Sequence, residues 1–260
     1  MRVQSEAEQC LGVPEAALTS KAINARIEQG QPLLAFDELD LNWPLLLDIS
    51  EKVTGVFIEY PELFGPAIES FKETGAGHLL TKEVVKTWLK DSSLPSGIVA
   101  DNVNEPLLES IIQATLSPFL VSYSKVLLNK VDSERWRRRY CPVCGGDPDF
   151  ASLDKEYGAR WLLCSRCNAE WLFQRLECPY CGSEDQNTLA YFTNDEGLYR
   201  LYVCEQCKQY LKAIDLRQAE SEVSLPLERL LTLDLDAQAQ ERGYSPCSSG
   251  STRSRGDKAG

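Results

Sequence analysis

The sequence predicts an α+β protein in which an all-helical bundle precedes two small tandem modules, each built around four cysteines, and a C-terminal helical segment. The cysteines are the first observation, because eight of the ten lie between Cys141 and Cys207 as Cys-x-x-Cys pairs. The second is the helical spacing of apolar residues before them. We expect the bundle at residues 1–134, the modules at 135–176 and 177–216, the C-terminal segment at 217–244, and a disordered tail at 245–260.

Apolar patterns of helical period, separated by Gly, Pro and Ser, predict helices in the bundle at about 14–27, 43–57 and 61–71. Thr81 is placed to cap a further helix, and Asn104 to cap the longest one. Pro118 falls inside that longest helix, so we expect a kink or a break there. The bundle contains no phosphate-binding loop, dinucleotide fingerprint or nucleophile elbow.

The N-terminus, the apolar stretches and the net charge indicate the cellular location and the class of partner. The N-terminus lacks a basic start followed by an apolar run, and no apolar stretch approaches the roughly 18–20 residues that span a bilayer. We therefore expect a cytoplasmic protein without membrane insertion, in which paired cysteines are more often reduced and metal-bound than joined as disulfides. The net charge of −12 repels phosphate backbones and argues against a nucleic acid partner.

The cysteine pairs have the spacing of metal sites. One Cys-x-x-Cys pair offers two thiolates to a tetrahedral metal, and a second pair about 15–20 residues later completes a four-sulfur site. Such a site has no open coordination position, which argues against metal-activated water and hydrolysis. His78 is the only histidine, so Cys2His2 sites are excluded, and Cys10 and Cys247 lie outside the pattern. The expected metal ligands are Cys141, Cys144, Cys164, Cys167, Cys178, Cys181, Cys204 and Cys207.

The pairs also form an internal repeat. Cys-Pro-Val-Cys-Gly at 141–145 matches Cys-Pro-Tyr-Cys-Gly at 178–182, and each copy ends with a further pair and an aromatic residue, Trp171 or Tyr210. The repeat favours pairing in sequence order, the first pair with the second and the third with the fourth, over an interleaved cross-brace. Modules of about 30–40 residues are too small for a sufficient apolar core, so a metal must supply stability.

Residues around the cysteines refine this picture. Gly145 and Gly182 follow their pairs at the point where the chain turns with positive φ, and Asn168 is tolerated at the same place. Lys208 is not an obvious choice there, so we expect the fourth pair to be built differently. The alternation of residues 198–203 predicts a strand that leads into the last pair.

A basic run at 135–139, Arg-Trp-Arg-Arg-Arg, links the bundle to the first cysteine pair. The interpretation we favour is a solvated hinge that partly neutralises the thiolate charge. The alternative is a docking patch for an acidic segment of a partner. Basic clusters alone are weak signals, so the run does not define a function.

These motifs resemble the formate dehydrogenase accessory (formation) protein family, FdhE. The resemblance covers about residues 135–244 and rests on RYCPVCGG, RWLLCSRCNAEWLFQRLECPYCG, YVCEQCKQYLKAIDLR and LPLERLLTLDLDAQAQERGY. It implies a cytoplasmic maturation factor that contacts the catalytic subunit of a respiratory molybdenum or tungsten formate dehydrogenase before export by the twin-arginine route. It also implies rubredoxin-like or zinc-ribbon modules holding two iron or zinc ions, one in each four-cysteine site.

Several functions fit two closed four-sulfur sites. We favour a non-enzymatic chaperone of formate dehydrogenase assembly, whose bundle and modules form a client-binding cleft with Trp161, Trp171, Tyr180 and Tyr210 as candidate contacts. An iron-dependent redox protein acting on the client's cysteines or cofactor is the first alternative, because four-sulfur sites accept iron as well as zinc. A zinc-ribbon nucleic-acid module is disfavoured by the charge. A thiol oxidoreductase is ranked last, since it would use one low-pKa pair at a helix start.

Overall fold

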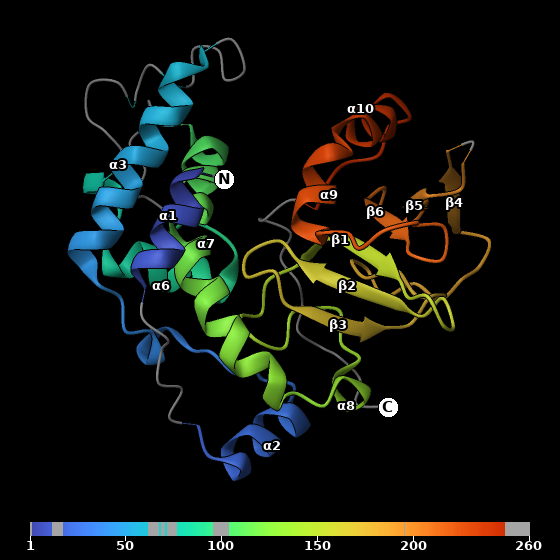
Figure 1. Cartoon of the computed structure of the whole chain (residues 1–260), viewed down its shortest axis with the longest axis horizontal. Helices are drawn as coiled ribbons and strands as arrows, with labels where there is room; N and C mark the ends of the chain where they lie inside the picture. The colour runs from blue at the N-terminus through green and yellow to red at the C-terminus, as the bar shows by residue number, and fades with distance from the viewer. Residues whose placement is uncertain are drawn as a thin grey trace.

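The computed structural model describes residues 2–11, 18–61, 68, 71, 77–95, 104–194 and 196–247. Figure 1 shows a helical bundle from the N-terminal half beside a sheet from the second half, with the C-terminal helices packed against the sheet. The expected α+β fold class is confirmed. The expected domain boundaries remain predictions, and residues 248–260 of the expected tail lie outside the described part of the chain.

The bundle differs from expectation mainly near its N-terminus. The helix expected at 43–57 is confirmed as α3. Of the helix expected at 14–27, residues 14–17 lie outside the described part of the chain, and α2 begins at Ser20, where Thr19 caps it by accepting a hydrogen bond from the Ala22 N–H at 3.3 Å. The segment expected at 61–71 falls almost entirely outside the described residues. The described elements are α1 (Arg2–Cys10), α2 (Ser20–Gln29), η1 (Phe36–Glu38), α3 (Trp43–Glu59), η3 (Gly77–Leu79), α6 (Lys82–Asp91), α7 (Glu105–Leu127), η4 (Leu128–Lys130) and α8 (Ser133–Trp136).

Both caps expected later in the bundle are confirmed. Thr81 Oγ1 accepts a hydrogen bond from the Val84 N–H at 3.2 Å at the start of α6. Asn104 Oδ1 accepts one from the Leu107 N–H at 2.9 Å at the start of α7. Each cap satisfies a backbone donor of the first turn that has no partner within its helix.

The expectation that Pro118 would kink or break the longest helix is wrong as regards a break, since α7 continues from Glu105 to Leu127. Pro118 has no N–H to donate to the carbonyl of Ala114, four residues earlier. The side-chain amide of Gln4, in α1, donates to that carbonyl instead at 3.2 Å. The packing of α1 on α7 therefore satisfies the acceptor that the proline leaves unpaired.

The segment Glu105–Lys130 is the one described helix that is long and apolar enough to cross a membrane, which corrects the expectation that no such stretch exists. However, 61% of its most apolar window is buried inside the protein. Ile111, Ile112 and Leu116 are almost fully buried within the bundle. An apolar helix that is buried in this way is accounted for as the core helix of the bundle.

The sheet joins the two cysteine modules. Each module contributes three antiparallel strands, and the strand expected before the last cysteine pair is β5. β1 and β6 pair in parallel, with Phe150 opposite Lys212 and Leu153 opposite Asp215, so the modules share one continuous sheet. Its order is β3-β2-β1-β6-β5-β4. The strands are β1 (Pro148–Leu153), β2 (Arg160–Cys164), β3 (Glu170–Phe173), β4 (Leu189–Thr193), β5 (Tyr199–Cys204) and β6 (Tyr210–Asp215).

The C-terminal helices α9 (Leu225–Leu231) and α10 (Leu233–Glu241) pack on this sheet, α9 against β1 and α10 against β6. Leu225 joins Phe150 and Ile214 in one buried cluster, and Ala239 joins Val203 in another. The segment that follows the second module thus covers apolar strand residues from both modules.

Asp215, at the end of β6, ties the shared sheet together through a buried carboxylate. It accepts hydrogen bonds from Arg200 Nη2 at 2.6 Å and from Arg217 Nη2 at 2.7 Å, and its side chain is fully buried. Hydrogen bonds from Arg217 and then Arg200 lower the pKa of Asp215 to about 2. Because this pKa lies below the ordinary value of about 3.9, the contribution to stability is complete above that value and is lost as the pH falls through about 2.

We expect Asp215→Asn to destabilise the protein by about 2–3 kcal/mol at neutral pH, because two guanidinium groups lose their carboxylate. The measurement is denaturant unfolding from about pH 7 to acid, with wild type and variant compared at equal metal content at each pH, because protonation of the thiolates releases metal in acid. The difference from wild type should shrink as the pH falls toward about 2. Glu156→Gln, on the exposed turn before β2, is the control, and a pH-independent difference for Asp215→Asn would contradict this account.

Candidate metal centres

The first cysteine cluster has the dimensions of one tetrahedral metal site. Cys141, Cys144, Cys164 and Cys167 are all buried, and their sulfur atoms lie within 4.8 Å of one another. The Sγ–Sγ distance is 3.5 Å between Cys141 and Cys167 and 3.5 Å between Cys144 and Cys164. A tetrahedron with metal–sulfur bonds of about 2.3 Å has edges of about 3.8 Å, so the four donors fit a single zinc or iron ion.

The second cluster repeats this arrangement with more exposure. Its members are Cys178, Cys181, Cys204 and Cys207, whose sulfur atoms also lie within 4.8 Å of one another. The Cys178–Cys207 and Cys181–Cys204 Sγ distances are both 3.7 Å. The cysteines thus gather in sequence order and not as a cross-brace. Metal binding by these eight residues remains a prediction.

All four cysteine pairs use the same backbone turn. In each, the N–H of the first cysteine donates to the carbonyl five residues later, at 2.8 to 3.0 Å. The residue after the second cysteine has positive φ in every case. These φ values are 73° at Gly145, 55° at Asn168, 75° at Gly182 and 56° at Lys208.

The expectation that the turn at Lys208 is built differently is therefore wrong. Its N–H donates to the Cys204 carbonyl at 2.8 Å, as Gly182 does to Cys178 at 2.9 Å. The side-chain contacts of Lys208 offset the steric cost of its left-handed backbone. Its Nζ pairs with Glu205 and lies 5.6 Å from the centre of the Tyr244 ring. The second turn of each module thus accepts a side chain, Asn168 or Lys208, where the first has glycine.

The thiols of the first cluster cannot all lose their protons without a counter-charge. Burial raises the pKa of Cys141 and of Cys167 well above the ordinary value. Hydrogen bonds from Cys141 and the other two neighbours lower the pKa of Cys144 well below it. A cation in the centre removes this conflict, because it compensates the charge of four thiolates. The donor set therefore fits a bound metal ion.

In the second cluster the pKa values of the thiols are also shifted in opposite directions. The hydrogen bond with Cys207 lowers the pKa of Cys178 to about 5, whereas burial raises the pKa of Cys181 to about 11. Cys181 and Cys207 are only half-buried. Solvent thus reaches two of the four donors of this cluster.

Backbone hydrogen bonds join the first cluster to the helical bundle. The N–H groups of Leu33 and Leu34 donate to the carbonyls of Pro142 and Val143, within the first cysteine pair, at 2.8 and 2.9 Å. Gly145 leaves room for this contact, since a Cβ there would lie 2.9 Å from Pro32 Cγ. The loop after α2 is therefore fitted against the first turn of the cluster.

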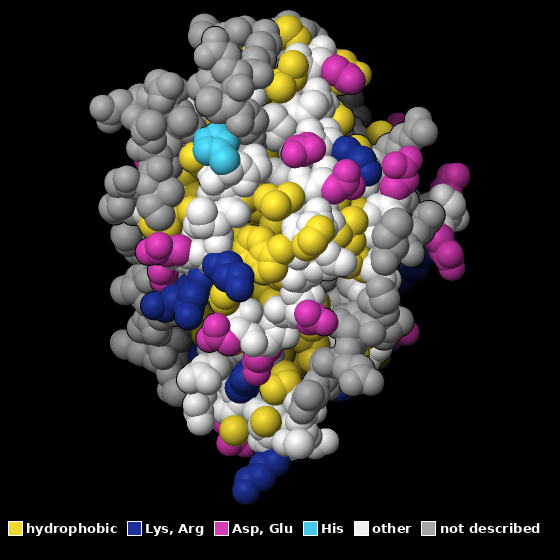
Figure 2. Space-filling model, turned by 90° about the vertical axis from the view of Figure 1, so that its left-hand side faces the viewer, with side chains coloured by type: hydrophobic (Ala, Val, Ile, Leu, Met, Phe, Trp, Pro, Cys, Tyr) yellow, Lys and Arg dark blue, Asp and Glu magenta, His cyan; other side chains and the backbone are white. Residues whose placement is uncertain are grey.

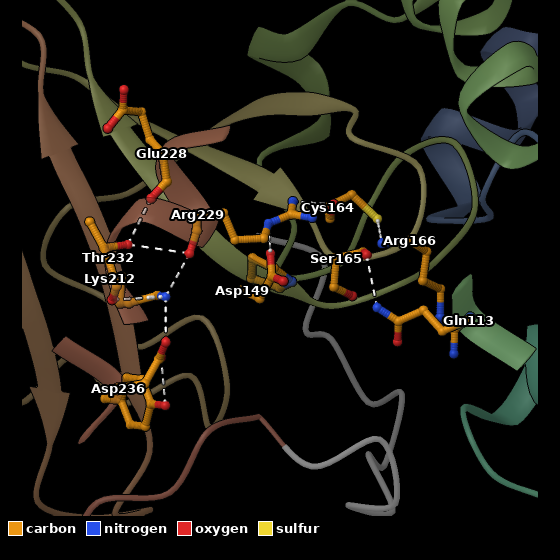
Figure 3. A network of polar contacts seen from close by, with 12 residues as sticks. Gln113, Asp149, Cys164, Ser165, Arg166, Lys212, Glu228, Arg229, Thr232 and Asp236 are labelled. Carbon is orange, nitrogen blue, oxygen red and sulfur yellow. Dashed lines mark hydrogen bonds and ion pairs between the residues drawn. The ribbon is translucent and has the colours of Figure 1, made fainter. Parts of the chain in front are cut away.

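Side chains from the bundle and from α9 hold the second turn of the first cluster (Figure 3). Gln113 Nε2, in α7, donates to the Ser165 carbonyl at 3.0 Å, and Arg229 Nη2, in α9, donates to the Cys164 carbonyl at 2.9 Å. Arg229 also pairs with Asp149 at 3.0 Å. The first cluster is thus the point where bundle, sheet and C-terminal helices meet.

Arg166 lies between Cys164 and Cys167, and its side chain extends from the cluster into the bundle. Its guanidinium donates to the carbonyls of Trp88 and Leu89 at 3.1 Å and lies 4.0 Å from the centre of the Trp88 ring. Arg166 is 3% exposed, so its charge is held inside the protein close to the thiolates. Sequence reasoning did not identify Arg166, Gln113 or Arg229, because their partners lie 52 to 78 residues away along the chain.

A cleft opens between the bundle and the C-terminal helices beside the first cluster. It consists of two adjoining cavities of about 330 and 780 Å³, and Cys167 and Asn168 line the larger one. Within it Lys212 Nζ donates to Asp236 at 2.6 Å and to the Arg229 carbonyl at 2.9 Å. Two ion pairs in the cleft, Lys212 with Asp236 and Arg229 with Asp149, therefore balance each other's charges (Figure 3).

Three of the aromatic residues expected as client contacts are buried. Trp171 is fully buried and donates through Nε1 to the Arg138 carbonyl at 2.8 Å. The hydroxyl of Tyr180 donates to the Pro148 carbonyl at 3.2 Å or the Tyr210 carbonyl at 3.1 Å, which holds β1 and β6 together. These side chains support the clusters, and only Trp161 is half-buried.

The basic run 135–139 has partners inside the protein. Arg135 pairs with Glu28 at 3.0 Å, Arg138 lies 5.6 Å from the centre of the Trp136 ring, and Arg139 donates to the Tyr180 carbonyl at 3.2 Å. The run therefore connects the bundle with both modules, and the hinge interpretation remains a prediction.

The fold and the clusters define a protein that combines a helical bundle with tandem four-cysteine modules. Residues 140–175 match the family model described as "FdhE, central domain". The chain is 30% identical over 239 residues to the protein FdhE homolog of Aquifex aeolicus, which covers 88% of this chain and 76% of that protein. The protein FdhE homolog of Pseudomonas aeruginosa is 26% identical over 239 residues, covering 88% and 73%.

A solved structure shows the same fold. The crystal structure of the FdhE protein from Pseudomonas aeruginosa aligns with a TM-score of 0.58 at 24% identity, over 98% of this chain and 86% of that one. With the similarity to the Aquifex aeolicus protein, the assignment from the cysteine motifs is confirmed: the chain belongs to the FdhE family. It is a formate dehydrogenase-related accessory protein with two clusters that could hold metal ions.

We expect the second cluster to lose its metal first, because Cys181 and Cys207 are half-buried whereas all four donors of the first are buried. Release into a chromogenic chelator should be biphasic, with rate constants that differ at least about tenfold. Cys178→Ser should remove the fast phase and Cys141→Ser the slow one. A single phase, or the reverse assignment, would contradict the proposed difference in exposure.

We expect Lys208→Gly to stabilise the metal-loaded chain by up to about 1 kcal/mol, because glycine adopts positive φ without steric cost. Denaturant unfolding measures the effect. Lys208→Ala is the matched control, since it retains the strained backbone but loses the contacts with Glu205 and Tyr244. The account is wrong if Lys208→Gly is no more stable than Lys208→Ala.

Proposed function

We propose that this protein is a non-enzymatic, cytoplasmic maturation factor that binds the catalytic subunit of formate dehydrogenase before that subunit is exported. Each cluster would hold one iron or zinc ion through its four cysteines. The observation that carries the proposal is the pair of closed four-sulfur clusters within a chain of the FdhE family. Sites without an open coordination position support a structural role, in which each metal ion cross-links two turns of the shared sheet.

The cleft beside the first cluster is the surface we propose for the client. Leu230 and Leu233 of the C-terminal helices line it and are 43% and 62% exposed. The opposite wall carries small or uncharged side chains of α7, among them Ser117 and Gln113. Because Lys125, Lys212 and Arg229 pair with Glu8, Asp236 and Asp149, the cleft favours a weakly charged segment with one apolar face.

The outer face of the bundle gives no support to a nucleic acid partner. Figure 2 shows that Lys and Arg side chains on this face are interspersed with Asp and Glu and do not form a continuous basic surface. Apolar side chains lie between them, and the exposed apolar residues of α3 include Leu47 and Val56, with Tyr60 directly after the helix. With a net charge of −12, this surface is better suited to a protein partner.

The partial exposure of the second cluster favours a second function, in which an iron ion held there exchanges one electron with a group on the client. This alternative predicts visible absorption in protein purified without added metal, retained in Cys141→Ser and lost in Cys178→Ser. A colourless, zinc-loaded protein would favour the structural role.

We expect the wild-type chain to capture the purified catalytic subunit in a pull-down. Cys141→Ser should reduce capture at least about tenfold, because it opens the cluster at which bundle, sheet and α9 meet. Cys178→Ser should also reduce formate dehydrogenase activity in cells that depend on this protein. Cys10→Ser, which changes a cysteine outside both clusters, serves as the control.

The cleft itself is tested by Leu230→Asp and Leu233→Asp, which change exposed side chains and should leave folding intact. Capture should fall while the metal content stays at wild-type values. Failure of the wild-type chain to bind, or full binding and activity after loss of either cluster, would refute the proposed function.

A further inference from the structure

The two edges of the shared sheet differ in how they are protected. β3 lies against α8, and Trp171, Leu172 and Phe173 are buried. β4 forms the opposite edge, away from the bundle in Figure 1, and four of its five residues are exposed. Proteins usually protect an open edge with charged residues, proline or a bulge. The sequence of β4, Leu-Ala-Tyr-Phe-Thr, contains neither charge nor proline, and its register with β5 is regular.

The hydrogen bonds at the two ends of β4 show which backbone groups face outward. The Glu205 N–H donates to the Thr188 carbonyl at 2.8 Å, and the Asn194 N–H donates to the Tyr199 carbonyl at 3.3 Å. In an antiparallel ladder hydrogen-bonded pairs alternate, so Ala190 and Phe192 bond with β5.

The residues between those pairs direct their backbone groups to the open side. Leu189, Tyr191 and Thr193 therefore point their N–H and C=O groups away from β5. Among the described residues, no backbone hydrogen bond is made at these positions on the outer side. Water satisfies these groups in the free chain, and an extended strand is the protein structure that can replace it along the whole row.

The side chains at this edge indicate the chemistry of a segment that could pair with β4. Tyr191 is 53% and Phe192 is 41% exposed, on opposite faces of the sheet. The guanidinium of Arg200 lies 5.0 Å from the centre of the Tyr191 ring, and that of Arg242 lies 4.5 Å from the centre of the Phe192 ring. Arg200 pairs with Asp215, whereas Arg242 is exposed and meets no carboxylate among the described residues.

We propose that β4 binds an extended segment of the client polypeptide as an additional strand of the sheet; this inference rests on the proposed function. The segment has apolar residues that contact Tyr191 and Phe192, and an acidic residue that pairs with Arg242. Main-chain hydrogen bonds to Tyr191 and Thr193 provide affinity, and the aromatic and arginine side chains provide specificity.

Other occupants of this edge are less well matched in charge. The C-terminal residues 248–260 carry three basic residues, Arg253, Arg255 and Lys258, against one acidic residue, Asp257, so Arg242 would repel this segment as a whole. Antiparallel pairing of β4 with a second copy around Tyr191 would bring two Arg242 side chains to the same short edge, where like charges are unfavourable. A partner segment that has an acidic residue and no excess of basic residues has neither problem.

Hydrogen exchange of the full chain, with and without the purified catalytic subunit, tests the proposal at residue resolution. The Tyr191 and Thr193 amides should exchange at least about tenfold more slowly in the complex. The Ala190 and Phe192 amides, already bonded to β5, should change little. If the subunit binds and the Tyr191 and Thr193 amides still exchange as in the free chain, the β4 proposal is wrong and the proposed function stands.

Tyr191→Pro provides the matched variant, because it removes an outward N–H and leaves the bonds to β5 intact. It should weaken subunit binding at least about tenfold, with unchanged metal content. Tyr191→Val, which keeps the N–H, should weaken binding less. Equal binding by Tyr191→Pro and wild type overturns the proposal, as does a self-association that Tyr191→Pro abolishes. Absence of binding by the wild-type chain overturns the proposed function together with it.

Discussion

The gathering of four sulfur atoms around one point, twice in the same sheet, is the constraint on which the second half of this protein depends. The turns of each module place four thiols where burial and mutual repulsion oppose full deprotonation. A bound metal ion would convert that unfavourable group of thiols into a cross-link between two turns. The shared hydrogen-bonding pattern of all four turns, including the one at Lys208, is the pattern expected if each pair of turns holds one ion.

The clusters have the same donors but different surroundings. The first is buried where Leu33 and Leu34 pair with its backbone and where Gln113 and Arg229 hold its second turn, so its integrity is linked to the placement of the bundle. The second lies in the half of the sheet farther from the bundle, and two of its donors reach solvent. Between them, the parallel pairing of β1 with β6 makes the modules one structural unit.

Local chemistry accounts for what the sequence could predict. The cysteine spacing indicated both clusters and their order, and Asn104 and Thr81 indicated helix starts, because ligand spacing and capping act over a few residues. The unbroken helix at Pro118 could not be predicted, since the compensating donor, Gln4, comes from a helix far away in the chain. The positions of Arg166 and Arg229, the shared sheet and the open edge at β4 likewise depend on pairings between distant segments.

X-ray absorption spectroscopy of the purified, metal-loaded chain, together with its metal content, tests the central claim most directly. The account predicts two metal ions per chain, each surrounded by four sulfur atoms at about 2.3 Å. Coordination by nitrogen or oxygen, a single ion per chain, or folded protein whose clustered cysteines are joined as disulfides would contradict it.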